Sequence, residues 1–224
     1  MPSNIDNLVV KKPWGNEYVV CKNKKTATWL LNINYKKKTS LHCHPKKKTG
    51  FILLSGAVEV MLGFYDKRIL KAPSKLMIRP GLFHSTKAIS KKGATVLEIE
   101  TPINKNDLVR FKDNYGRENK PYEGKEKMTK KTNKNLIFKI LKINEINKYK
   151  TKNLEITVEK HSISKNLFKK PKNTIFAVLG GGLVDRKNQY VLSPGDIVKT
   201  DTIKKLSKVF KIKKNISILT CRKI

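Results

Sequence analysis

Short segments that alternate apolar and polar residues recur along this chain and restrict it to a small set of folds. Examples lie at 26–34, 57–62, 76–78, 86–89 and 95–100. Successive side chains of an extended strand point to opposite faces, so each segment predicts a strand with one buried face. Turn signals such as Pro80-Gly81 separate them at intervals of about eight to twelve residues, which is typical of antiparallel barrels and sandwiches. The sequence therefore predicts an all-β protein.

Three of the four histidines lie in two short segments of the first half. His42 and His44 are two residues apart, so an extended strand places both on one face. His84 follows the Pro80-Gly81 turn, which can bring a second strand back beside the first. Neutral imidazole is a common ligand of divalent metals, so we expect these histidines to hold zinc, iron, nickel or manganese. The alternative is that the His-x-His pair is only the polar face of a solvated strand.

The order of these residues resembles a known family. His42-x-His44, then Gly56, then Pro80-Gly81-x-x-His84 is similar to the two motifs of the cupin superfamily, whose members are small β-barrels. The resemblance implies that the first half is a cupin barrel with its metal ligands inside.

One ligand of the cupin pattern is replaced. The superfamily normally has a glutamate between the second histidine and the glycine, and counting back from Gly56 gives Thr49 in that place. A neutral hydroxyl is a poor ligand for zinc or iron. Glu98 and Glu100, on one face of the strand predicted at 94–100, or a water molecule, are alternative sources of the missing oxygen. The other interpretation of Glu98 and Glu100 is a solvated strand face.

Two further segments sharpen the resemblance. The chain opens with Lys12-Pro13-Trp14-Gly15, and Asp-x-x-Arg and Asp-x-Tyr-Gly-Arg sequences end at Arg110 and Arg117. These are similar to the cupin domain of type II mannose-6-phosphate isomerases, over about residues 11 to 118. The resemblance implies that Arg110 and Arg117 bind the sugar phosphate and that Arg117 is also catalytic. The alternative is that Asp107–Arg110 and Asp113–Arg117 are ion pairs within a short helix.

The net charge of +33 arises from 50 Lys and Arg against 17 Asp and Glu. Most of these cations are lysines, whereas proteins that recognise nucleic acid usually rely on arginine and interleaved aromatic residues, so no nucleic-acid partner is expected. The positive field favours anionic small molecules. Lys46, Lys47 and Lys48 directly follow the histidines and are expected to contact a phosphate or carboxylate, the alternative being a solvated loop.

Cysteine use and hydropathy indicate the compartment. Cys21, Cys43 and Cys221 have no CxxC spacing and are interpreted as free thiols of a reducing compartment. Cys43 is expected to face away from the histidines into packing. No window of about eighteen apolar residues and no signal pattern is present, so we expect a cytoplasmic protein with no membrane partner.

The second half repeats the first weakly. We expect a metal-binding barrel over 1–118, a linker or surface excursion over 119–135, and a degenerate cupin-like barrel over 136–224, which makes the chain a bicupin. Strands are predicted at 136–141, 154–158 and 174–182 and in two runs between 203 and 224. Pro194-Gly195 repeats Pro80-Gly81, but Val198 stands where His84 would be.

The second barrel is therefore expected to hold no metal and to have a structural, dimer-forming or site-shaping role. His161 is expected to be a surface residue. Because unpaired barrel edges favour pairing between protomers, we expect a homodimer.

These features together predict a metal-dependent isomerase of an anionic sugar, such as a sugar phosphate, in surface-polysaccharide or sugar-nucleotide metabolism. The metal would be a Lewis acid, Glu98 or Glu100 the general base, and Arg117 with a lysine the phosphate site. Three alternatives remain: a non-catalytic sugar or sugar-nucleotide binding module, an iron-dependent oxygenase, and a basic nucleic-acid binder.

Overall fold

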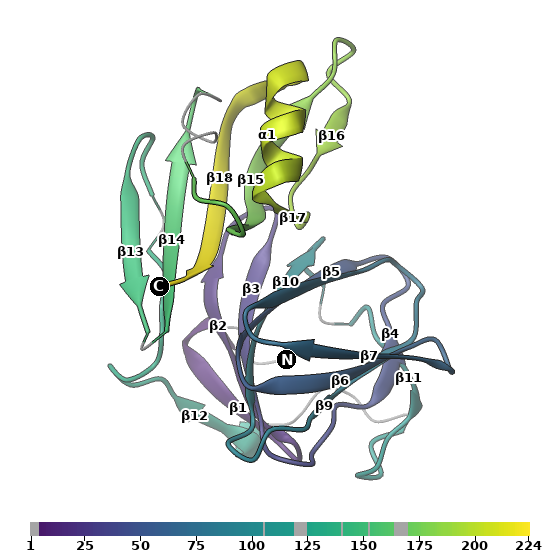
Figure 1. Cartoon of the computed structure of the whole chain (residues 1–224). Coiled ribbons are helices and arrows are strands. Elements are labelled where there is room, and N and C mark those ends of the chain that lie inside the picture. Colours follow the sequence, from purple (N-terminus) through teal and green to yellow (C-terminus); the bar gives the residue numbers. More distant parts are fainter. Residues whose placement is uncertain (1–4, 105, 119–124, 140, 152, 164–169) are drawn as a thin grey trace. The chain divides into compact units, whose positions relative to one another are not determined.

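The computed structural model describes residues 5–104, 106–118, 125–139, 141–151, 153–163 and 170–224. The chain divides into two compact units, Met1–Lys22 with Ala27–Ile137 (unit 1) and Asn23–Thr26 with Phe138–Ile224 (unit 2). Antiparallel strands make up most of both units (Figure 1), so the prediction of an all-β protein is confirmed. Among the described residues, no helix is long and apolar enough to cross a membrane.

Unit 1 contains two antiparallel sheets. The first has the order β12-β1-β2-β3-β10-β5-β8. Its strands are β1 (Leu8–Lys12), β2 (Gly15–Lys22), β3 (Ala27–Ile33), β5 (Lys48–Ser55), β8 (Ser74–Ile78), β10 (Ala94–Thr101) and β12 (Met128–Lys130). The second has the order β11-β4-β9-β6-β7. Its strands are β4 (Leu41–Cys43), β6 (Ala57–Leu62), β7 (Asp66–Lys71), β9 (His84–Ala88) and β11 (Val109–Lys112).

The inner faces of these two sheets share one apolar core. Trp29 and Leu31 of the first sheet and Val58, Val60 and Leu62 of the second belong to the same buried cluster. Burial alternates strictly along β6, which is the pattern expected of a strand with one face in a core. Each large side chain that is fully buried in this way contributes roughly 1.5–3 kcal/mol relative to exposure.

The glycine of the cupin-like motif lies at the turn between β5 and β6. Gly56 has a φ of +79°, and a Cβ there would lie 2.3 Å from the carbonyl oxygen of Gly93. Glycine is therefore required by the turn conformation and by the close approach of two backbones.

The segment expected to connect the two halves contains a strand and a turn. Residues 119–124 lie outside the described residues, η2 (Lys125–Lys127) is a 3-10 turn, and β12 pairs with β1, with Leu8 opposite Lys130. At least this part of 119–135 belongs to a sheet of unit 1 and is more than a linker. At the other end of the unit, η1 (Ile5–Asn7) is a second 3-10 turn before β1.

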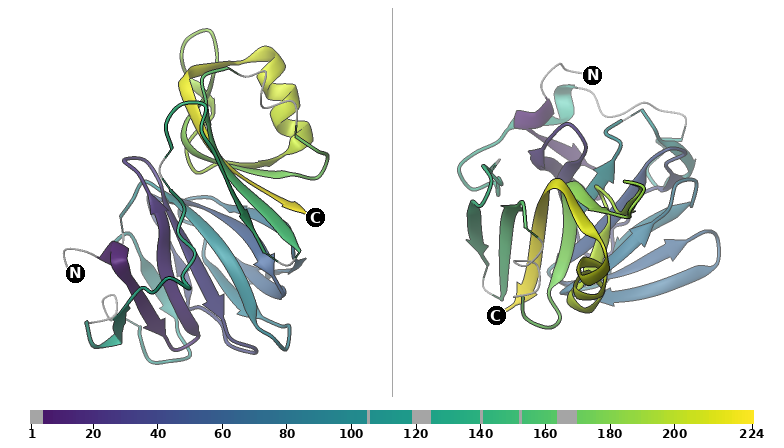
Figure 2. Two further views of the ribbon diagram at one scale, coloured as in Figure 1. Left: turned by 90° about the vertical axis from the view of Figure 1, so that its left-hand side faces the viewer. Right: turned by 90° about the horizontal axis from the view of Figure 1, so that it is seen from above.

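Unit 2 is a curled antiparallel sheet with the order β13-β14-β18-β15-β16, and β17 also pairs with β15. The sheet bends round toward α1 (Figure 2). Its elements are β13 (Ile146–Lys150), β14 (Leu154–His161), β15 (Ile175–Val184), β16 (Tyr190–Leu192), β17 (Ile197–Lys199), α1 (Thr200–Val209) and β18 (Lys211–Lys223).

Two strand predictions in unit 2 were wrong. The first of the two runs expected between 203 and 224 is largely α1, because Ile203 and Leu206 are three residues apart and reach the core from one helical face. The described residues of 136–141 form no strand, although Phe138 and Leu141 are buried. Apolar alternation over so few residues did not distinguish a strand from other buried conformations.

Candidate metal centre and surrounding pocket

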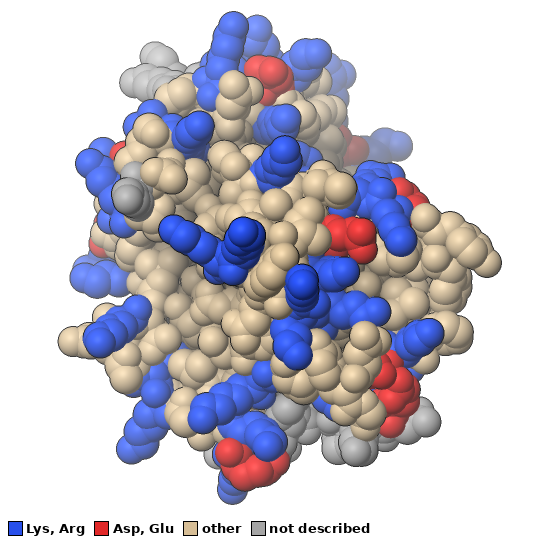
Figure 3. Space-filling model, turned by 60° about the horizontal axis from the view of Figure 1, so that its bottom comes forward, with Lys and Arg blue, Asp and Glu red and all other residues tan. Residues whose placement is uncertain are grey.

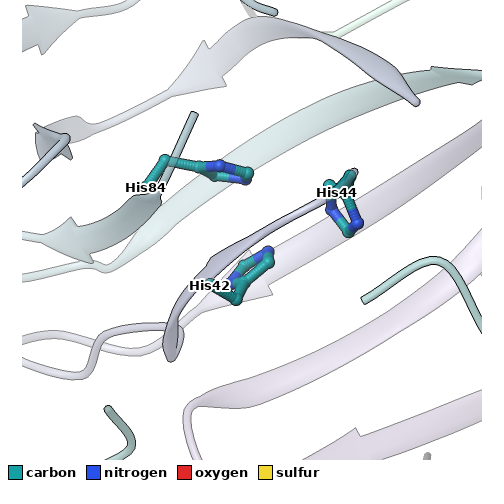
Figure 4. Close-up of side chains that lie close together, drawn as sticks. All are labelled: His42, His44 and His84. Atoms are coloured by element: carbon teal, nitrogen blue, oxygen red, sulfur yellow. The ribbon is translucent and has the colours of Figure 1, made fainter. Parts of the chain in front are cut away.

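His42, His44 and His84 come together in unit 1, as the sequence predicts. His42 lies on β4, His44 follows that strand, and His84 is the first residue of β9, opposite His42 in the register (Figure 4). One ligand nitrogen from each ring lies within 4.8 Å of the other two. A shift of at most about 0.7 Å per ring would bring all three to the 2.0–2.1 Å at which histidine binds zinc.

The turn before β9 fixes this arrangement. Gly81 has a φ of +74°, a backbone conformation that residues with a side chain rarely adopt. Its N–H donates to the carbonyl oxygen of His44 at 2.8 Å and so ties the turn to the other ligand segment. Cys43, between His42 and His44, is buried at 6% exposure, as expected for a side chain on the opposite face.

Each ring has a backbone partner for its Nδ1 atom. The Nδ1 atoms lie 2.8 Å from the Ser40 carbonyl for His42, 2.5 Å from the Asp107 carbonyl for His44 and 3.0 Å from the Leu82 carbonyl for His84. An imidazole that donates from Nδ1 to a carbonyl carries its lone pair on Nε2, the arrangement typical of metal-ligating histidines.

The second nitrogen of His84 shows that the site fits a cation. Its Nε2 atom is buried and has no hydrogen-bond partner among the described residues. A buried polar atom without a partner costs free energy, which a metal ion at this position would remove. His42, His44 and His84 are therefore a group that could hold a metal ion.

The surroundings keep these imidazoles neutral. Burial lowers the pKa of His42 well below 6.5, helped by the neighbouring His84 and His44. Burial and the Lys47 ammonium lower the pKa of His44 to about 3, and burial lowers that of His84 to about 4. Neutral imidazole is the form that binds metals, so the rings are ready as ligands at neutral pH.

His42 and His84 line a small cavity that also contains Glu98. His42 and His44 line a larger one of about 80 Å³. It is lined by residues from both sheets and from the segment after β10: Lys12, Trp14, Glu17, Leu31, Thr39, Ser40, His42, His44, Lys47, Glu98, Glu100, Leu108, Arg110 and Arg117. The structure thus brings five of the predicted site residues, Lys47, Glu98, Glu100, Arg110 and Arg117, to the same cavity as His42 and His44. Lys46 and Lys48 do not line it, and Lys46 is exposed.

Lys47 and Glu100 form a buried ion pair in the cavity wall. Their side chains are 2% and 1% exposed, and the Lys47 Nζ lies 2.7 Å from one Glu100 oxygen. The other Glu100 oxygen accepts a hydrogen bond from Trp29 Nε1 at 3.0 Å. Two donors thus fix the orientation of the Glu100 carboxylate. Burying both charges is costly unless the geometry is good, so the pair is a specific feature of this site.

Thr49 occupies the place where the cupin pattern has a glutamate. It is 1% exposed, and its hydroxyl has no hydrogen-bond partner among the described residues. Glu100 is opposite Thr49 in the register of β5 and β10, so both side chains share a face. A carboxylate is therefore present one strand away, although the group within 4.8 Å consists of the three imidazoles.

The two arginines reach the cavity from β11 and the turn after it. Arg110 is opposite His42 in the register. The Arg117 guanidinium donates to the Asp113 carboxylate, from Nε to Oδ2 at 3.0 Å and from Nη2 to Oδ1 at 2.8 Å. The alternative of a short helix with two ion pairs was wrong, because Val109–Lys112 is a strand. The Asp113–Arg117 pair exists, but it belongs to a turn. Although burial opposes the charge on Asp113, hydrogen bonds from Arg117 lower its pKa overall.

Sequence reasoning missed the role of Asp107. Its carboxylate accepts the backbone N–H groups of Lys46 at 3.1 Å and Lys47 at 2.8 Å, while its carbonyl binds His44 Nδ1. One residue therefore fixes both a candidate ligand and the turn that carries Lys47. The sequence shows only an acidic residue about sixty positions after a run of lysines. That pattern gives no indication that the Asp107 carboxylate accepts backbone N–H groups.

The expectation of a surface position for His161 was wrong. His161 is 3% exposed on β14, and its Nε2 lies 2.8 Å from Glu159 Oε2. Burial raises the pKa of Glu159, but hydrogen bonds from His161, Lys170 and Thr157 outweigh it and lower the pKa to about 2. This buried polar cluster lies on the inner face of unit 2. Val198, at the position corresponding to His84, packs against the apolar core there.

Comparisons with known proteins agree with the fold class only. No protein-family model and no curated protein matches the chain. Solved structures with a related fold include a protein with a double-stranded β-helix domain from Klebsiella pneumoniae, 18% identical, covering 43% of this chain and 84% of that one with a TM-score of 0.40. KdgF from Halomonas sp. is 17% identical, covering 42% and 86% with a TM-score of 0.40. A putative sugar phosphate isomerase from Acidithiobacillus ferrooxidans is 17% identical, covering 35% and 51% with a TM-score of 0.33.

One of these neighbours has a double-stranded β-helix domain, and another is described as a putative sugar phosphate isomerase. Their identities and TM-scores are too low to assign an activity to this chain.

Proposed function

We propose that unit 1 is a metal-dependent enzyme that isomerises an anionic sugar, with a sugar phosphate such as mannose 6-phosphate as the first candidate substrate. One observation carries the proposal: three neutral imidazoles with carbonyl-bound Nδ1 atoms lie together, and two of them, His42 and His44, line a cavity that also contains arginines and carboxylates. His42, His44 and His84 would hold the metal ion. When bound, the ion would supply Lewis acidity toward carbonyl and hydroxyl oxygens.

The cations of the cavity would bind the anionic group of the substrate. Arg117 is suited to this because the Asp113 carboxylate, bound at Nε and Nη2, fixes the orientation of its guanidinium, and arginine is a common ligand of phosphate. Arg110 lies beside His42 and would face the same ligand. Among the lysines, Lys47 is the candidate contact, since Lys46 and Lys48 do not line the cavity.

The proton transfer requires a carboxylate that can reach adjacent carbon atoms. In an aldose–ketose isomerisation, a base takes the proton from C2 and returns it to C1, while a second proton moves between the two oxygens. Glu98 borders the cavity and is only partly buried. Both oxygens of Glu100 accept hydrogen bonds from Lys47 and Trp29. We therefore assign the base to Glu98 and a positioning role to Glu100.

A second candidate function is supported by Thr49. Because a hydroxyl stands in place of the expected carboxylate and Glu100 is held by Lys47, the same pocket suits a module that binds an anionic sugar without converting it. An iron-dependent oxygenase would use the same three histidines, but we find no separate observation that favours it.

The test combines metal loading with a direct assay. Purified protein loaded with zinc, manganese, nickel or iron is incubated with mannose 6-phosphate, and its conversion to the ketose is followed by NMR. Glu98→Gln is expected to lower kcat by about 10²–10⁴ with binding retained, and Arg117→Ala is expected to act mainly on KM. Ligand binding without turnover in the native protein would establish the binding module. The absence of both binding and turnover would refute an anionic sugar ligand.

A further inference from the structure

The outer face of the second sheet of unit 1 carries an exposed aromatic cluster. Phe64 and Tyr65 form the tip of the β6–β7 hairpin, Phe83 lies just before β9, and Phe111 is on β11. The Phe64 ring centroid lies 5.1 Å from that of Phe111 and 5.6 Å from that of Phe83. We call these four residues the aromatic cluster. Residues from three separate segments thus form one continuous apolar surface.

This cluster is strongly exposed. Tyr65 is 94% exposed, Phe111 59% and Phe64 48%, and Ile69 on the neighbouring strand is 64% exposed. Contiguous exposed apolar surface on a soluble domain usually marks an interaction site. A side chain as exposed as Tyr65 projects from the surface and does not line a groove, so the surface suits insertion into a partner better than reception of a ligand.

The register shows which charged residues share the face of the cluster. Val58, Val60 and Leu62 point into the core, so Ala57, Glu59 and Met61 of β6 point outward. Directly opposite residues share a face, which places Lys71 beside Ala57 and Lys67 beside Met61.

Two further lysines belong to this face. Lys87 is opposite Glu59 in the register of β6 and β9, and Lys112 is opposite Leu41, the outward neighbour of His42. The outer face therefore carries four lysines, and Glu59 is the carboxylate among its described strand residues. Asp66, at the hairpin, is paired with Arg68 at 2.8 Å and adds no net charge.

The chain as a whole has the same sign. Its net charge is +33, and Figure 3 shows lysines and arginines spread over the face in view, with uncharged surface at the right-hand edge, the side on which the β6–β7 hairpin lies in Figure 1. A second copy of this chain would set lysines against lysines on this face. An anionic surface is the complementary partner.

We propose that the outer face of the second sheet binds peripherally to membranes rich in anionic lipids. The aromatic cluster would enter the headgroup region, where amphipathic and aromatic side chains are favoured, and Lys67, Lys71, Lys87 and Lys112 would lie over the lipid phosphates. The lack of a membrane-spanning segment has no bearing on this contact, which needs surface residues only. The cavity of unit 1 is not involved, so the inference is independent of the proposed enzyme.

The test is co-sedimentation of the full chain with vesicles. Vesicles of phosphatidylcholine mixed with phosphatidylserine are expected to pellet the protein, less so as salt is added, and pure phosphatidylcholine vesicles are not. The double variant Phe64→Ser/Tyr65→Ser is expected to bind the mixed vesicles about tenfold more weakly. Tyr35→Ser, which changes an aromatic residue 40% exposed outside the cluster, is the matched control and is expected to bind like the native chain.

Three results would overturn the proposal. The first is no binding to the mixed vesicles. The second is equal binding by the double variant, which would mean that charge alone attracts the protein. The third is light scattering that shows a dimer in the native chain and a monomer in the double variant, which would assign the face to a second copy. Thermal unfolding of each variant checks that the hairpin change leaves the fold intact.

Discussion

Asp107→Asn should weaken metal binding although residue 107 is not a ligand. The Asp107 carboxylate accepts the N–H groups of Lys46 and Lys47, and its carbonyl lies 2.5 Å from His44 Nδ1. Asparagine keeps one acceptor oxygen and places an amide NH₂ near the other N–H group. The turn from 45 to 47 then loses at least one charge-assisted hydrogen bond and releases the backbone that orients the His44 ring.

The size of the effect follows from these contacts. A hydrogen bond to a charged group is worth roughly 1.5–3 kcal/mol, so the free energy of unfolding of the variant should fall by that amount. Its urea midpoint should fall with it. Loss of an outer partner of a metal ligand typically costs about 10- to 100-fold in metal affinity. We therefore expect both changes together in Asp107→Asn.

Zinc affinity is measured by competition with a chromogenic chelator, and stability by urea unfolding. Asp113→Asn is the matched control, because Asp113 is an equally buried acid of the same segment whose side-chain partner is Arg117. The control should lose stability but keep its zinc affinity. Native affinity in Asp107→Asn, or equal losses of affinity in both variants, would contradict a role of the Asp107 carboxylate in orienting His44.

Three further predictions concern buried titratable groups. Lys47→Met removes the ammonium beside Glu100 and should destabilise unit 1 by about 3–5 kcal/mol, against about 0.5 kcal/mol or less for exposed Lys46→Met, both measured by urea unfolding. Glu159→Gln should cost about 3 kcal/mol at neutral pH and little near pH 2, because a pKa lowered from 4.5 to about 2 gives stability that is lost as pH falls through that range. Metal-free protein should lose stability as pH falls from 6.5 to about 4, because unfolded His84 takes up a proton that the folded residue does not. Thermal melting measured across this pH range should show a smaller loss of stability in His84→Gln. An unchanged pH dependence would contradict the lowered pKa of His84.

Much of unit 1 could be predicted because its strands follow simple periodicities. The His-x-His spacing and the Pro80-Gly81 turn determined the meeting of three imidazoles, since a strand period of two and a turn geometry are local properties. The face shared by Glu98 and Glu100 followed from the same period. The resemblance to cupins predicted that Arg110 and Arg117 belong to the site, and both line the cavity.

Other features depend on contacts distant in sequence. Lys46, Lys47 and Lys48 look alike in the sequence, and only the position of Glu100 on β10 determines that Lys47 is buried. His161 is buried because Glu159 and residues from other segments satisfy its polar atoms.

Secondary structure was missed where the local pattern was weak. β12, at 128–130, has little apolar alternation of its own, and its pairing is supplied by β1. The helix over 200–209 has few apolar positions, so its sequence does not show a helical period clearly.

The metal site proposed for His42, His44 and His84 would bind one divalent ion through the Nε2 atom of each ring. The most direct measurement is the anomalous diffraction signal of crystals grown from metal-loaded protein, together with the metal content of the native chain and of His84→Gln by mass spectrometry. We expect one anomalous peak within coordination distance of the three nitrogens, and loss of the bound ion in the variant. A loaded protein with no peak among these rings, or a variant that retains the ion, would contradict this metal site.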